Sequence, residues 1–431
     1  MATAPTSPLP RPRAATVKPD ASSPTIPDDS PLLRLGRRID AVTERGVVCP
    51  GDLPAPSDPT LADRVRAAKE ALGDRVVVLG HHYQREQVIE FADFRGDSFK
   101  LAQDASRQDA EFIVFCGVHF MAESASILAR EDQKVILPDL AAGCSMADMA
   151  EARQLADCWE RLERAGVAGA TVPLTYMNST AAIKAFCGER EGAICTSSNA
   201  PRAMRWAFDD ADIPAASEDR KVLFLPDQHL GRNTAVLALG LELDDCVVYD
   251  PWQPDGGLTD DELAAARVIL WKGHCSVHAR FQPEMVTEAR EELGEDALIL
   301  VHPECRHEVV LQADKVGSTS QIIGWVDEAP PGTNIAIATE LNLVRRLGLE
   351  YPDKNVVFLD DTVCFCATMN RIDLPHLTWV LENLVAGEVI NEVRVDPDTR
   401  HWAKVALDRM LDLPGDDASL VQNAAEASPD A

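Results

Sequence analysis

The sequence predicts an α/β protein made of three similar αβα units, each with three layers and a parallel sheet, arranged about a pseudo-threefold axis. Three observations lead to this prediction. Short apolar runs alternate with longer amphipathic stretches, a polar triplet follows one run in each third of the chain, and a cysteine follows a later run in each third. Continuous apolar runs separated by helical segments are typical of parallel sheets that helices cover on both faces.

The predicted strands are apolar runs that lie between about Leu61 and Met410. They occupy residues 76–79, 113–115, 134–137, 222–225, 268–270, 298–301 and 356–359. The amphipathic stretches between them predict the covering helices. Because the same order of features occurs three times, the pattern indicates a long-period internal repeat. The alternative is a chance alignment within a generic α/β sheet, in which strands followed by polar residues are common.

Each predicted unit contributes a polar triplet and, at a similar distance after it, a hydroxyl residue. These are His81-His82-Tyr83 with Ser98, Tyr176-Met177-Asn178 with Ser197, and His302-Pro303-Glu304 with Thr319. Functional side chains of parallel α/β units collect at the carboxyl ends of the strands. If the three units face one another, each one places a triplet, a hydroxyl group and a thiol at a shared centre.

The repeat also predicts how the chain divides into domains. The predicted segments are a poorly ordered tail at 1–45, a first unit at 60–150 completed by 370–412, a second unit at 151–275, a third unit at 276–369 and a flexible tail at 413–431. The second unit is longer than the other two, and we expect an insertion in its acidic region 241–262.

The composition excludes several classes of partner. Lys and Arg number 41 against 70 Asp and Glu, which gives a net charge of −29 and argues against nucleic acid or an anionic membrane as a partner. The chain contains no apolar run long enough for a membrane span, and its N-terminal region has no apolar segment of the secretory type. Eleven cysteines in such a chain predict a cytoplasmic, reducing location, where they stay thiols or bind metal.

Three of these cysteines are candidate metal ligands. Cys144, Cys275 and Cys366 each lie in a short glycine-containing or polar segment just after a predicted strand. Three thiolates from separate units suit either zinc or an iron–sulfur cluster with one iron left open. Neither C-x₂-C zinc pairs nor ferredoxin-type runs occur, so spacing alone does not decide between the two metals. The cysteines that we expect to be inert core thiols are Cys116, Cys158 and Cys246.

Two further cysteines have open roles. Cys364 and Cys366 form a C-x-C pair, which is either a ligand with a bystander or a thiol pair whose oxidation releases the metal group. Cys305 follows the third triplet, and we expect it to pack behind the site.

The polar triplets supply groups for acid–base chemistry beside an open metal site. The candidates for proton transfer are His81, Tyr83, Tyr176, His302 and Glu304, and the neutral donors suited to carboxylate or phosphate oxygens are Ser98, Asn178, Ser197 and Thr319. Each has a structural alternative, because such hydroxyls are often helix N-caps and such rings often pack in the core. His278, close after Cys275, is a further acid or base, and His274 is a weaker neighbour. The candidates for a supporting layer are His119, His229 and Asn342.

Several long segments together resemble the quinolinate synthase family, the A proteins of bacterial NAD biosynthesis. The resemblance covers the body of the chain from about Asp63 to Met410. Its motifs lie at 80–84, 92–98, 115–123, 142–149, 225–231, 273–275, 302–305, 317–319 and 366–370. Signatures of other chemistries are missing, including the dinucleotide-binding glycine motif, the phosphate-binding loop and the zinc-protease motif.

The resemblance implies three αβα domains around one [4Fe–4S] cluster per chain, and it favours iron–sulfur over zinc. The implied ligands are Cys144, Cys275 and Cys366. The implied reaction condenses iminoaspartate (iminosuccinate) with dihydroxyacetone phosphate to give quinolinate, phosphate and water, and an L-aspartate oxidase or dehydrogenase is the implied transient donor. This chain departs from the family at the third cysteine segment, where C-x-C replaces C-x-x-C-x-x-C.

The resemblance also implies roles for individual residues. The positions that match substrate-binding residues are His81, Ser98, Tyr176, Met177, Asn178, Ser197, His302, Pro303, Glu304 and Thr319. The expected catalytic residues are Tyr83, Tyr176, His302 and Glu304, with Tyr83 and Glu304 preferred for proton transfer. Two other functions stay open at this point: a zinc-dependent aldolase or lyase that uses the same thiols, and an iron–sulfur sensor that turns nothing over.

Overall fold

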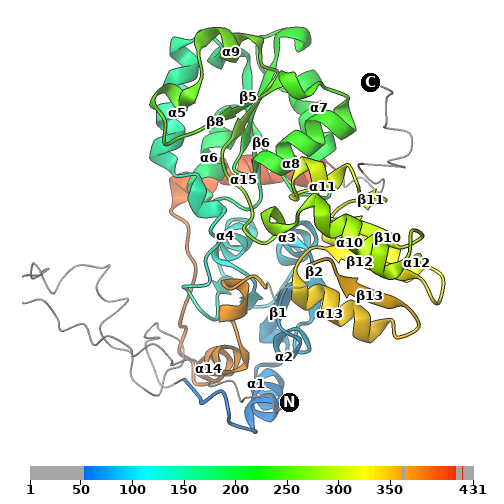
Figure 1. The fold of residues 1–431 in the computed structure, drawn as a ribbon. Helices are drawn as coiled ribbons and strands as arrows, with labels where there is room; N and C mark the ends of the chain where they lie inside the picture. Colours follow the sequence, from blue (N-terminus) through cyan, green and yellow to red (C-terminus); the bar gives the residue numbers. More distant parts are fainter. Residues whose placement is uncertain (1–52, 361–364, 414–419, 421–431) are drawn as a thin grey trace, which may run out of the picture. The chain divides into compact units, whose positions relative to one another are not determined.

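The computed structural model describes residues 53–360, 365–413 and 420. Within them the chain forms three parallel sheets with helices between the strands (Figure 1), which confirms the predicted fold class. The predicted N-terminal tail at 1–45, most of the predicted C-terminal tail and Cys364 lie outside the described residues.

The first sheet has the strand order β2-β1-β3-β4, with every pair parallel. Its strands are β1 (Val76–His81), β2 (Phe94–Gly96), β3 (Phe112–Cys116) and β4 (Lys134–Ile136). The helices of this unit are α1 (Leu61–Leu72), α2 (Glu86–Ile89), α3 (Ser98–Ser106) and α4 (His119–Leu128). All six residues of β1 and all five of β3 are buried, as expected for central strands covered on both faces.

The third unit repeats this topology with the order β11-β10-β12-β13. Its strands are β10 (Leu298–Val301), β11 (Lys315–Val316), β12 (Asn334–Ala338) and β13 (Asn355–Phe358). Its helices are α10 (Pro283–Leu293), α11 (His307–Val310), α12 (Thr319–Glu328) and α13 (Leu341–Glu350). The first and third sheets therefore share one arrangement, in which the strand that carries the polar triplet pairs with the short second strand on one side and the third strand on the other.

The second unit has the same arrangement with one strand added at the edge, in the order β6-β5-β7-β9-β8. Its strands are β5 (Thr171–Tyr176), β6 (Ala193–Cys195), β7 (Lys221–Leu225), β8 (Cys246–Tyr249) and β9 (Val268–Trp271). Its helices are α5 (Ala152–Arg164), α6 (Ala181–Glu189), α7 (Ala200–Asp209), α8 (Gln228–Asn233), which continues into a π-helical turn at Thr234–Ala238, and α9 (Asp260–Ala265).

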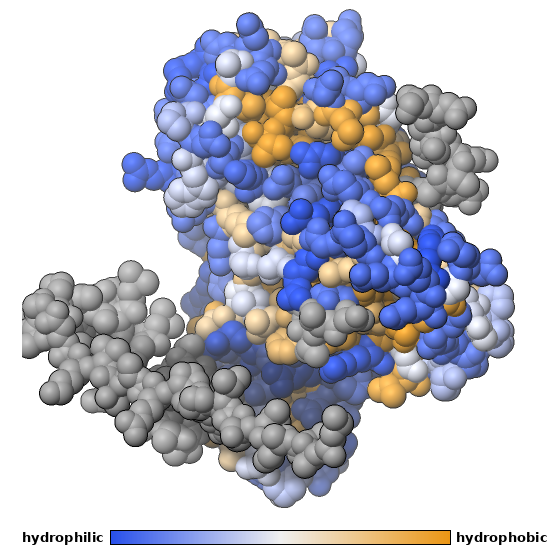
Figure 2. Space-filling model, viewed as in Figure 1, coloured by the Kyte–Doolittle hydropathy of each residue, from blue (hydrophilic) through white to orange (hydrophobic). Residues whose placement is uncertain are grey.

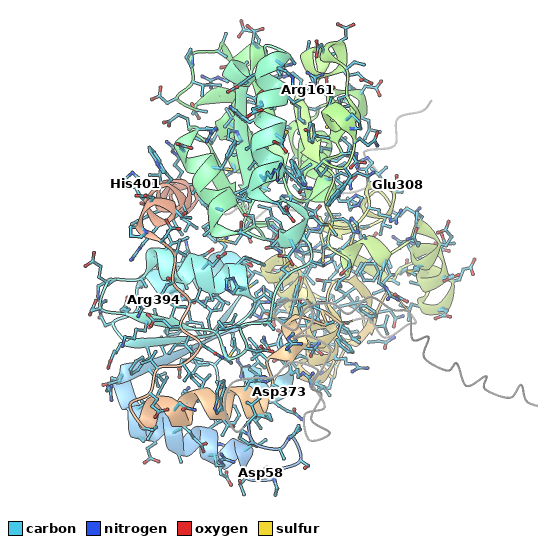
Figure 3. All side chains as sticks on the ribbon, turned by 90° about the vertical axis from the view of Figure 1, so that its left-hand side faces the viewer. Asp58, Arg161, Glu308, Asp373, Arg394 and His401 are labelled. Atoms are coloured by element: carbon cyan, nitrogen blue, oxygen red, sulfur yellow. The ribbon has the colours of Figure 1, made fainter. Side chains whose placement is uncertain are left out.

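The added strand β8 lies in the region where the sequence predicts an insertion, and helix α9 begins at the end of that region. Arg161 of α5 holds this region in place, because its Nη2 donates to the Leu258 carbonyl at 3.0 Å and pairs with Asp260 at 2.7 Å. The Arg161 side chain is labelled on the second unit in Figure 3.

The cysteine segments repeat as well. Cys144, Cys275 and Cys366 each follow the last strand of their unit along the chain (β4, β9 and β13) and precede a short 3₁₀ turn. These turns are Ala147–Met149, His278–Arg280 and Met369–Arg371. Each cysteine therefore leaves its sheet at the carboxyl end, at the edge where the polar triplets also emerge.

The last two helices are α14 (Leu374–Val385) and α15 (Pro397–Asp412). Helix α14 packs against α1, and Arg64 donates to both carboxylate oxygens of Glu382 at 2.7 Å. Helix α15 packs against α6 and α4, and a Cβ added at Gly188 would meet the Trp402 carbonyl at 2.0 Å. This C-terminal segment thus contacts both the first and the second unit, and the exact domain boundaries stay a prediction.

Hydrophilic residues cover most of the face drawn in Figure 2, while apolar residues gather over part of the second unit. Among the described helices, none combines the length and the apolar character that crossing a bilayer requires. The apolar residues that fill the sheets are almost fully buried, so packing between sheet and helices carries the fold.

The central strand of the third unit offers a test of this packing. Ile337 of β12 has no exposed surface, so Ile337→Ala removes buried methyl groups and leaves a cavity. We expect it to lower the free energy of unfolding by about 2–5 kcal/mol in urea denaturation. Leu349 of α13, which is 77% exposed, is the control, and Leu349→Ala should change that free energy by less than about 0.5 kcal/mol.

Candidate active site

One cavity takes side chains from all three units at the carboxyl ends of their sheets. Its walls contain His81, Tyr83, Asp97, Ser98, Val118, Phe120, Met121, Cys144, Tyr176, Asn178, Thr196, Ser197, Cys275, Val277, His278, His302, Glu304, Thr319, Glu340, Cys366, Thr368 and Met369. The three predicted ligand cysteines therefore line the same space as members of all three polar triplets. This meeting is what the threefold repeat predicts.

The three thiols affect one another electrostatically. Burial raises the pKa of Cys144 to about 12, and the charge of Cys366 adds to this effect. Burial raises the pKa of Cys275 as well, with further contributions from Glu304, Cys144 and Cys366. Burial likewise raises the pKa of Cys366. Thiolates in this setting need a positive partner, and a bound metal centre is the kind of partner that deprotonates such thiols.

The donor set fits a soft metal centre. Sulfur ligands select zinc, copper(I) or iron–sulfur clusters over harder cations. Three sulfurs from three separate units leave a fourth position of a tetrahedral or cubane centre to another ligand. The cavity residues therefore fit both metal groups that the cysteine pattern predicts.

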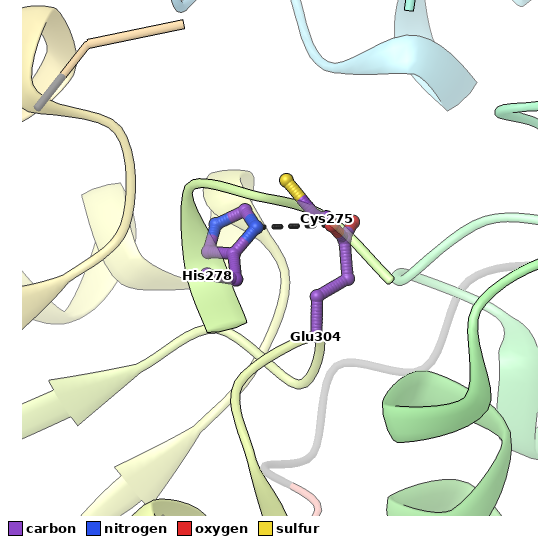
Figure 4. Close-up of side chains that lie close together, drawn as sticks. All are labelled: Cys275, His278 and Glu304. Carbon is purple, nitrogen blue, oxygen red and sulfur yellow. Dashed lines mark hydrogen bonds and ion pairs between the residues drawn. The ribbon is translucent and has the colours of Figure 1, made fainter. Parts of the chain in front are cut away.

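A hydrogen-bonded chain of three buried side chains lies beside Cys275. Tyr176 donates from its phenol to Glu304 Oε1 at 2.5 Å, and His278 Nδ1 lies 2.9 Å from Glu304 Oε2. Figure 4 shows His278 and Glu304 joined in this way next to the Cys275 sulfur. One ligand atom each from Cys275, His278 and Glu304 lies within 4.8 Å of the other two, so this group could also hold a single metal ion.

The protonation states in this chain follow from burial and hydrogen bonding. Burial opposes the charge on Glu304, but His278, His302 and the hydrogen bonds from His278 and Tyr176 hold its pKa below the usual range. Burial, together with the nearby Glu304 charge, raises the pKa of Tyr176 well above its ordinary value. An ionised carboxylate thus accepts a hydrogen bond from a phenol that retains its proton.

The first residues of two triplets adopt the same local geometry. His81 Nδ1 accepts from the Tyr83 amide at 3.1 Å, and His302 Nδ1 accepts from the Glu304 amide at 3.4 Å. Because Nδ1 is the acceptor, the neutral ring carries its proton on Nε2. Burial lowers the pKa of His81 and brings that of His302 to about 3, so both rings are neutral donors. The His302 ring also stacks on His278 with the centroids 4.4 Å apart.

A second phenol faces the cavity from the first unit. Tyr83 Oη lies 2.9 Å from both Thr319 Oγ1 and Thr339 Oγ1. Burial raises the pKa of Tyr83 well above its ordinary value. This hydroxyl group connects the first unit to the third and stays protonated at neutral pH.

The predicted hydroxyl residues lie at or near helix starts. Ser98 and Thr319 are the first residues of α3 and α12, and Ser197 lies between β6 and α7. Asn178 Oδ1 is buried and has no hydrogen-bond partner among the described residues. Such an orphaned acceptor on a cavity wall is a place where a ligand donor can bind.

Two predicted substrate-binding residues do not line the cavity. Met177 is buried, and its sulfur accepts from Ser124 Oγ at 3.3 Å. The Pro303 carbonyl accepts from Asn233 Nδ2 at 2.8 Å. Met177 is thus held through its side chain and Pro303 through its backbone, and their contact with substrate stays a prediction.

The residues expected in a supporting layer are not part of the cavity wall, and their role stays a prediction. Asn342 Nδ2 donates to the Tyr83 carbonyl at 3.1 Å, while His119 lies 3.8 Å from Glu123 and His229 has an unpaired, buried Nδ1 among the described residues. Cys305 is buried and donates to the Ala338 carbonyl at 3.7 Å, and the His274 amide donates to the Met149 sulfur at 3.4 Å.

Four residues near the cavity escape the sequence reasoning: Asp97, Asp227, Thr339 and Glu340. Asp97 Oδ2 accepts from Ser198 Oγ at 3.2 Å and from Ser320 Oγ at 2.7 Å, which joins all three units at one carboxylate. Asp97, Asp227 and Glu340 are helix N-caps, a position that the residue types and the strand-to-helix change could have indicated.

Comparisons with known proteins show the family of this chain. Residues 63–412 match the family model for the quinolinate synthetase A protein. The chain is 63% identical over 388 residues to a quinolinate synthase of Nocardioides sp., a match that covers 90% of this chain and 98% of the relative. It is 62% identical to a quinolinate synthase of Streptomyces coelicolor, over 89% of this chain and 96% of the relative. By this breadth of match, the chain belongs to the quinolinate synthetase A protein family.

Proposed function

We propose that this chain is a quinolinate synthase that condenses iminoaspartate with dihydroxyacetone phosphate and releases quinolinate, phosphate and two waters. It would be a condensing and dehydrating enzyme of transferase or lyase type. The observation that carries the proposal is the presence of Cys144, Cys275 and Cys366 in one cavity with the Tyr176–Glu304–His278 chain.

In this proposal the three cysteines hold a [4Fe–4S] cluster. A cluster held by three thiolates has one iron without a cysteine ligand, and that iron supplies Lewis acidity toward a substrate oxygen. The cysteine sulfurs come from three separate units, so the bound cluster would also fix the units against one another.

The proton transfers fall to the buried side chains. Forming quinolinate removes protons from carbon and delivers protons to departing oxygen atoms. Glu304, held in its ionised form, is the acceptor in this proposal, and the phenols of Tyr176 and Tyr83 are the donors. His302 would donate from Nε2 to a substrate oxygen, since its Nδ1 is engaged with the Glu304 amide.

Neutral donors would bind the substrate anions. Among the described residues that line the cavity, there is no lysine or arginine. Carboxylate and phosphate oxygens would therefore meet the neutral donors of the wall and the starts of α3 and α12, where backbone amides and the helix dipole favour negative charge. The neutral donors are His81, Ser98, Asn178, Ser197 and Thr319.

A mononuclear metal enzyme is the second candidate, because Cys275, His278 and Glu304 have ligand atoms within 4.8 Å of one another. A zinc-dependent aldolase or lyase would use this group. A third reading, an iron–sulfur sensor, would bind the cluster without turnover.

An anaerobic assay with metal analysis separates these readings. We expect the full chain, purified without oxygen, to contain iron and sulfide and to form quinolinate from iminoaspartate and dihydroxyacetone phosphate. Removing the iron with a chelator should abolish product formation. Zinc without sulfide would favour the mononuclear enzyme, and a cluster without product would favour the sensor.

A further inference from the structure

Two buried carboxylates occupy the same place in the second and third units. Asp227 caps α8, where its Oδ1 accepts from the His229 and Leu230 amides at 2.8 Å. Glu340 caps α13, where its Oε2 accepts from the Asn342 amide at 2.7 Å and the Leu343 amide at 3.3 Å. Neither residue has exposed surface. Each follows the third strand of its unit, so the two positions correspond in the repeat.

The second oxygen of each carboxylate binds a predicted ligand cysteine. Asp227 Oδ2 accepts from the Cys275 amide at 3.2 Å, and Glu340 Oε1 accepts from the Cys366 amide at 3.2 Å. Each carboxylate therefore connects the start of a helix to the backbone of a cysteine. That cysteine follows the neighbouring strand of the same sheet. This second contact goes beyond helix capping, because it reaches the backbone of Cys275 in one unit and of Cys366 in the other.

The first unit has no carboxylate at the corresponding helix start. The corresponding N-cap residue is Val118, whose side chain offers no acceptor. There the His119 amide donates to the Ala142 carbonyl at 2.8 Å, so the segment before Cys144 is held by a backbone contact. The three cysteines thus occupy corresponding positions in the repeat. A carboxylate binds the amide of Cys275 and of Cys366, whereas a backbone contact holds the segment before Cys144.

Further contacts keep both carboxylate-bound segments close. The Gln228 amide donates to the Gly273 carbonyl at 3.0 Å, and a Cβ added at Gly273 would meet the Pro226 carbonyl at 2.3 Å. In the third unit, Asn342 Nδ2 donates to Asn370 Oδ1 at 3.2 Å, and the Asn370 amide donates to the Cys366 carbonyl at 3.0 Å. Each cysteine segment therefore lies against the helix start that carries its carboxylate.

We propose that Asp227 and Glu340 are positioning residues that fix the backbones of Cys275 and Cys366, so that two of the three thiols are oriented before the metal group binds. The role of the thiols as cluster ligands rests on the proposed function. Partners behind metal ligands orient them and typically change metal affinity by about 10- to 100-fold when they are substituted. Both cysteine amides donate to a carboxylate and are thus not free to donate to a sulfur, a hydrogen bond that would alter the potential of a bound cluster.

The test uses the isosteric variants Asp227→Asn and Glu340→Gln. Each amide side chain can keep the cap with its oxygen, because Asn and Gln retain a carbonyl acceptor. The side-chain NH₂ group then faces the cysteine N–H. Because both groups are donors, the hydrogen bond to the cysteine amide is lost. The control is Asp396→Asn at the exposed N-cap of α15, where Asp396 accepts from the Thr399 amide at 3.0 Å and contacts no cysteine.

Hydrogen exchange of the metal-free full chain measures the positioning role directly. We expect Asp227→Asn to speed exchange about 5- to 10-fold in the peptide that contains Cys275 and to leave the Cys366 peptide unchanged. Glu340→Gln should do the reverse, and Asp396→Asn should affect neither. After anaerobic reconstitution, both variants should lose iron to a chelator about 10-fold faster than the parent chain.

The outcomes separate this proposal from the proposed function. Unchanged exchange in both cysteine peptides, or changes confined to the first turns of α8 and α13, would overturn the positioning role. If the exchange pattern is reciprocal but the parent chain retains neither iron nor sulfide, the positioning role stands and the cluster assignment fails.

Discussion

Serine in place of Cys144, Cys275 or Cys366 is expected to leave the chain folded and to abolish both cluster retention and quinolinate formation. A serine hydroxyl is a harder and far less acidic ligand than a thiol, so a soft metal centre loses one of its three anchors. Substituting a residue that supports a metal ligand typically lowers metal affinity or activity by about 10- to 100-fold. We therefore expect the loss of a ligand itself to lower activity by more than about 100-fold. Iron and sulfide analysis of the anaerobically purified variants measures the first effect, and the quinolinate assay measures the second.

Cys246 supplies the matched control for these substitutions. It is half-buried at the start of β8 and lies outside the cavity wall. Cys246→Ser should retain the iron content and the activity of the parent chain. If one of the three cavity cysteines can be changed to serine with iron, sulfide and activity intact, that residue is not a ligand.

Tyr176→Phe and Glu304→Gln should keep the cluster and lose turnover. Each substitution preserves shape and changes one partner of the 2.5 Å contact between the phenol and Glu304 Oε1. Tyr176→Phe removes the proton donor, and Glu304→Gln replaces the acceptor with an uncharged amide. Positioned acid–base groups typically contribute about 10²- to 10⁴-fold to rate, so we expect kcat to fall by that range while iron content stays constant.

A tyrosine outside the cavity provides the comparison for this pair. Tyr249 stacks on Trp271 in the second unit, with the ring centroids 5.7 Å apart. Tyr249→Phe should leave kcat unchanged. Because Glu308 is exposed on α11 (Figure 3), Glu308→Gln is the matched control for Glu304→Gln. Retained turnover in Tyr176→Phe and Glu304→Gln would instead assign proton transfer to other groups.

The sequence predicts the repeat well because parallel strands buried on both faces leave a strong pattern. The apolar run at 76–79 became β1 and the run at 356–359 became β13, each with a change of a residue or two at its ends. The polar triplets were visible for the same reason, since each interrupts the apolar pattern where a strand ends. The place of Cys144, Cys275 and Cys366 at the carboxyl ends of their sheets then follows from the strand arrangement that the three units share.

The sequence pattern does not predict the contacts between units, because these contacts depend on how the units pack. Nothing in the local sequence pairs Tyr176 with Glu304, which lies 128 residues later. The sequence also does not predict that Ser198 and Ser320 both donate to Asp97, because each serine resembles an ordinary residue at a helix start. Glu340 was missed because its unit-one counterpart is Val118, so the acidic position recurs in only two of the three units.

In the function that we propose, three thiols from three units hold a cluster with one iron open to substrate. Mössbauer spectroscopy of the chain, reconstituted with ⁵⁷Fe without oxygen, tests this most directly. We expect a [4Fe–4S] spectrum in which one iron site changes when dihydroxyacetone phosphate is added and the other three do not. The proposed function would be contradicted if the chain bound no such cluster. It would also be contradicted if the signals of all four irons stayed unchanged when the substrate was added.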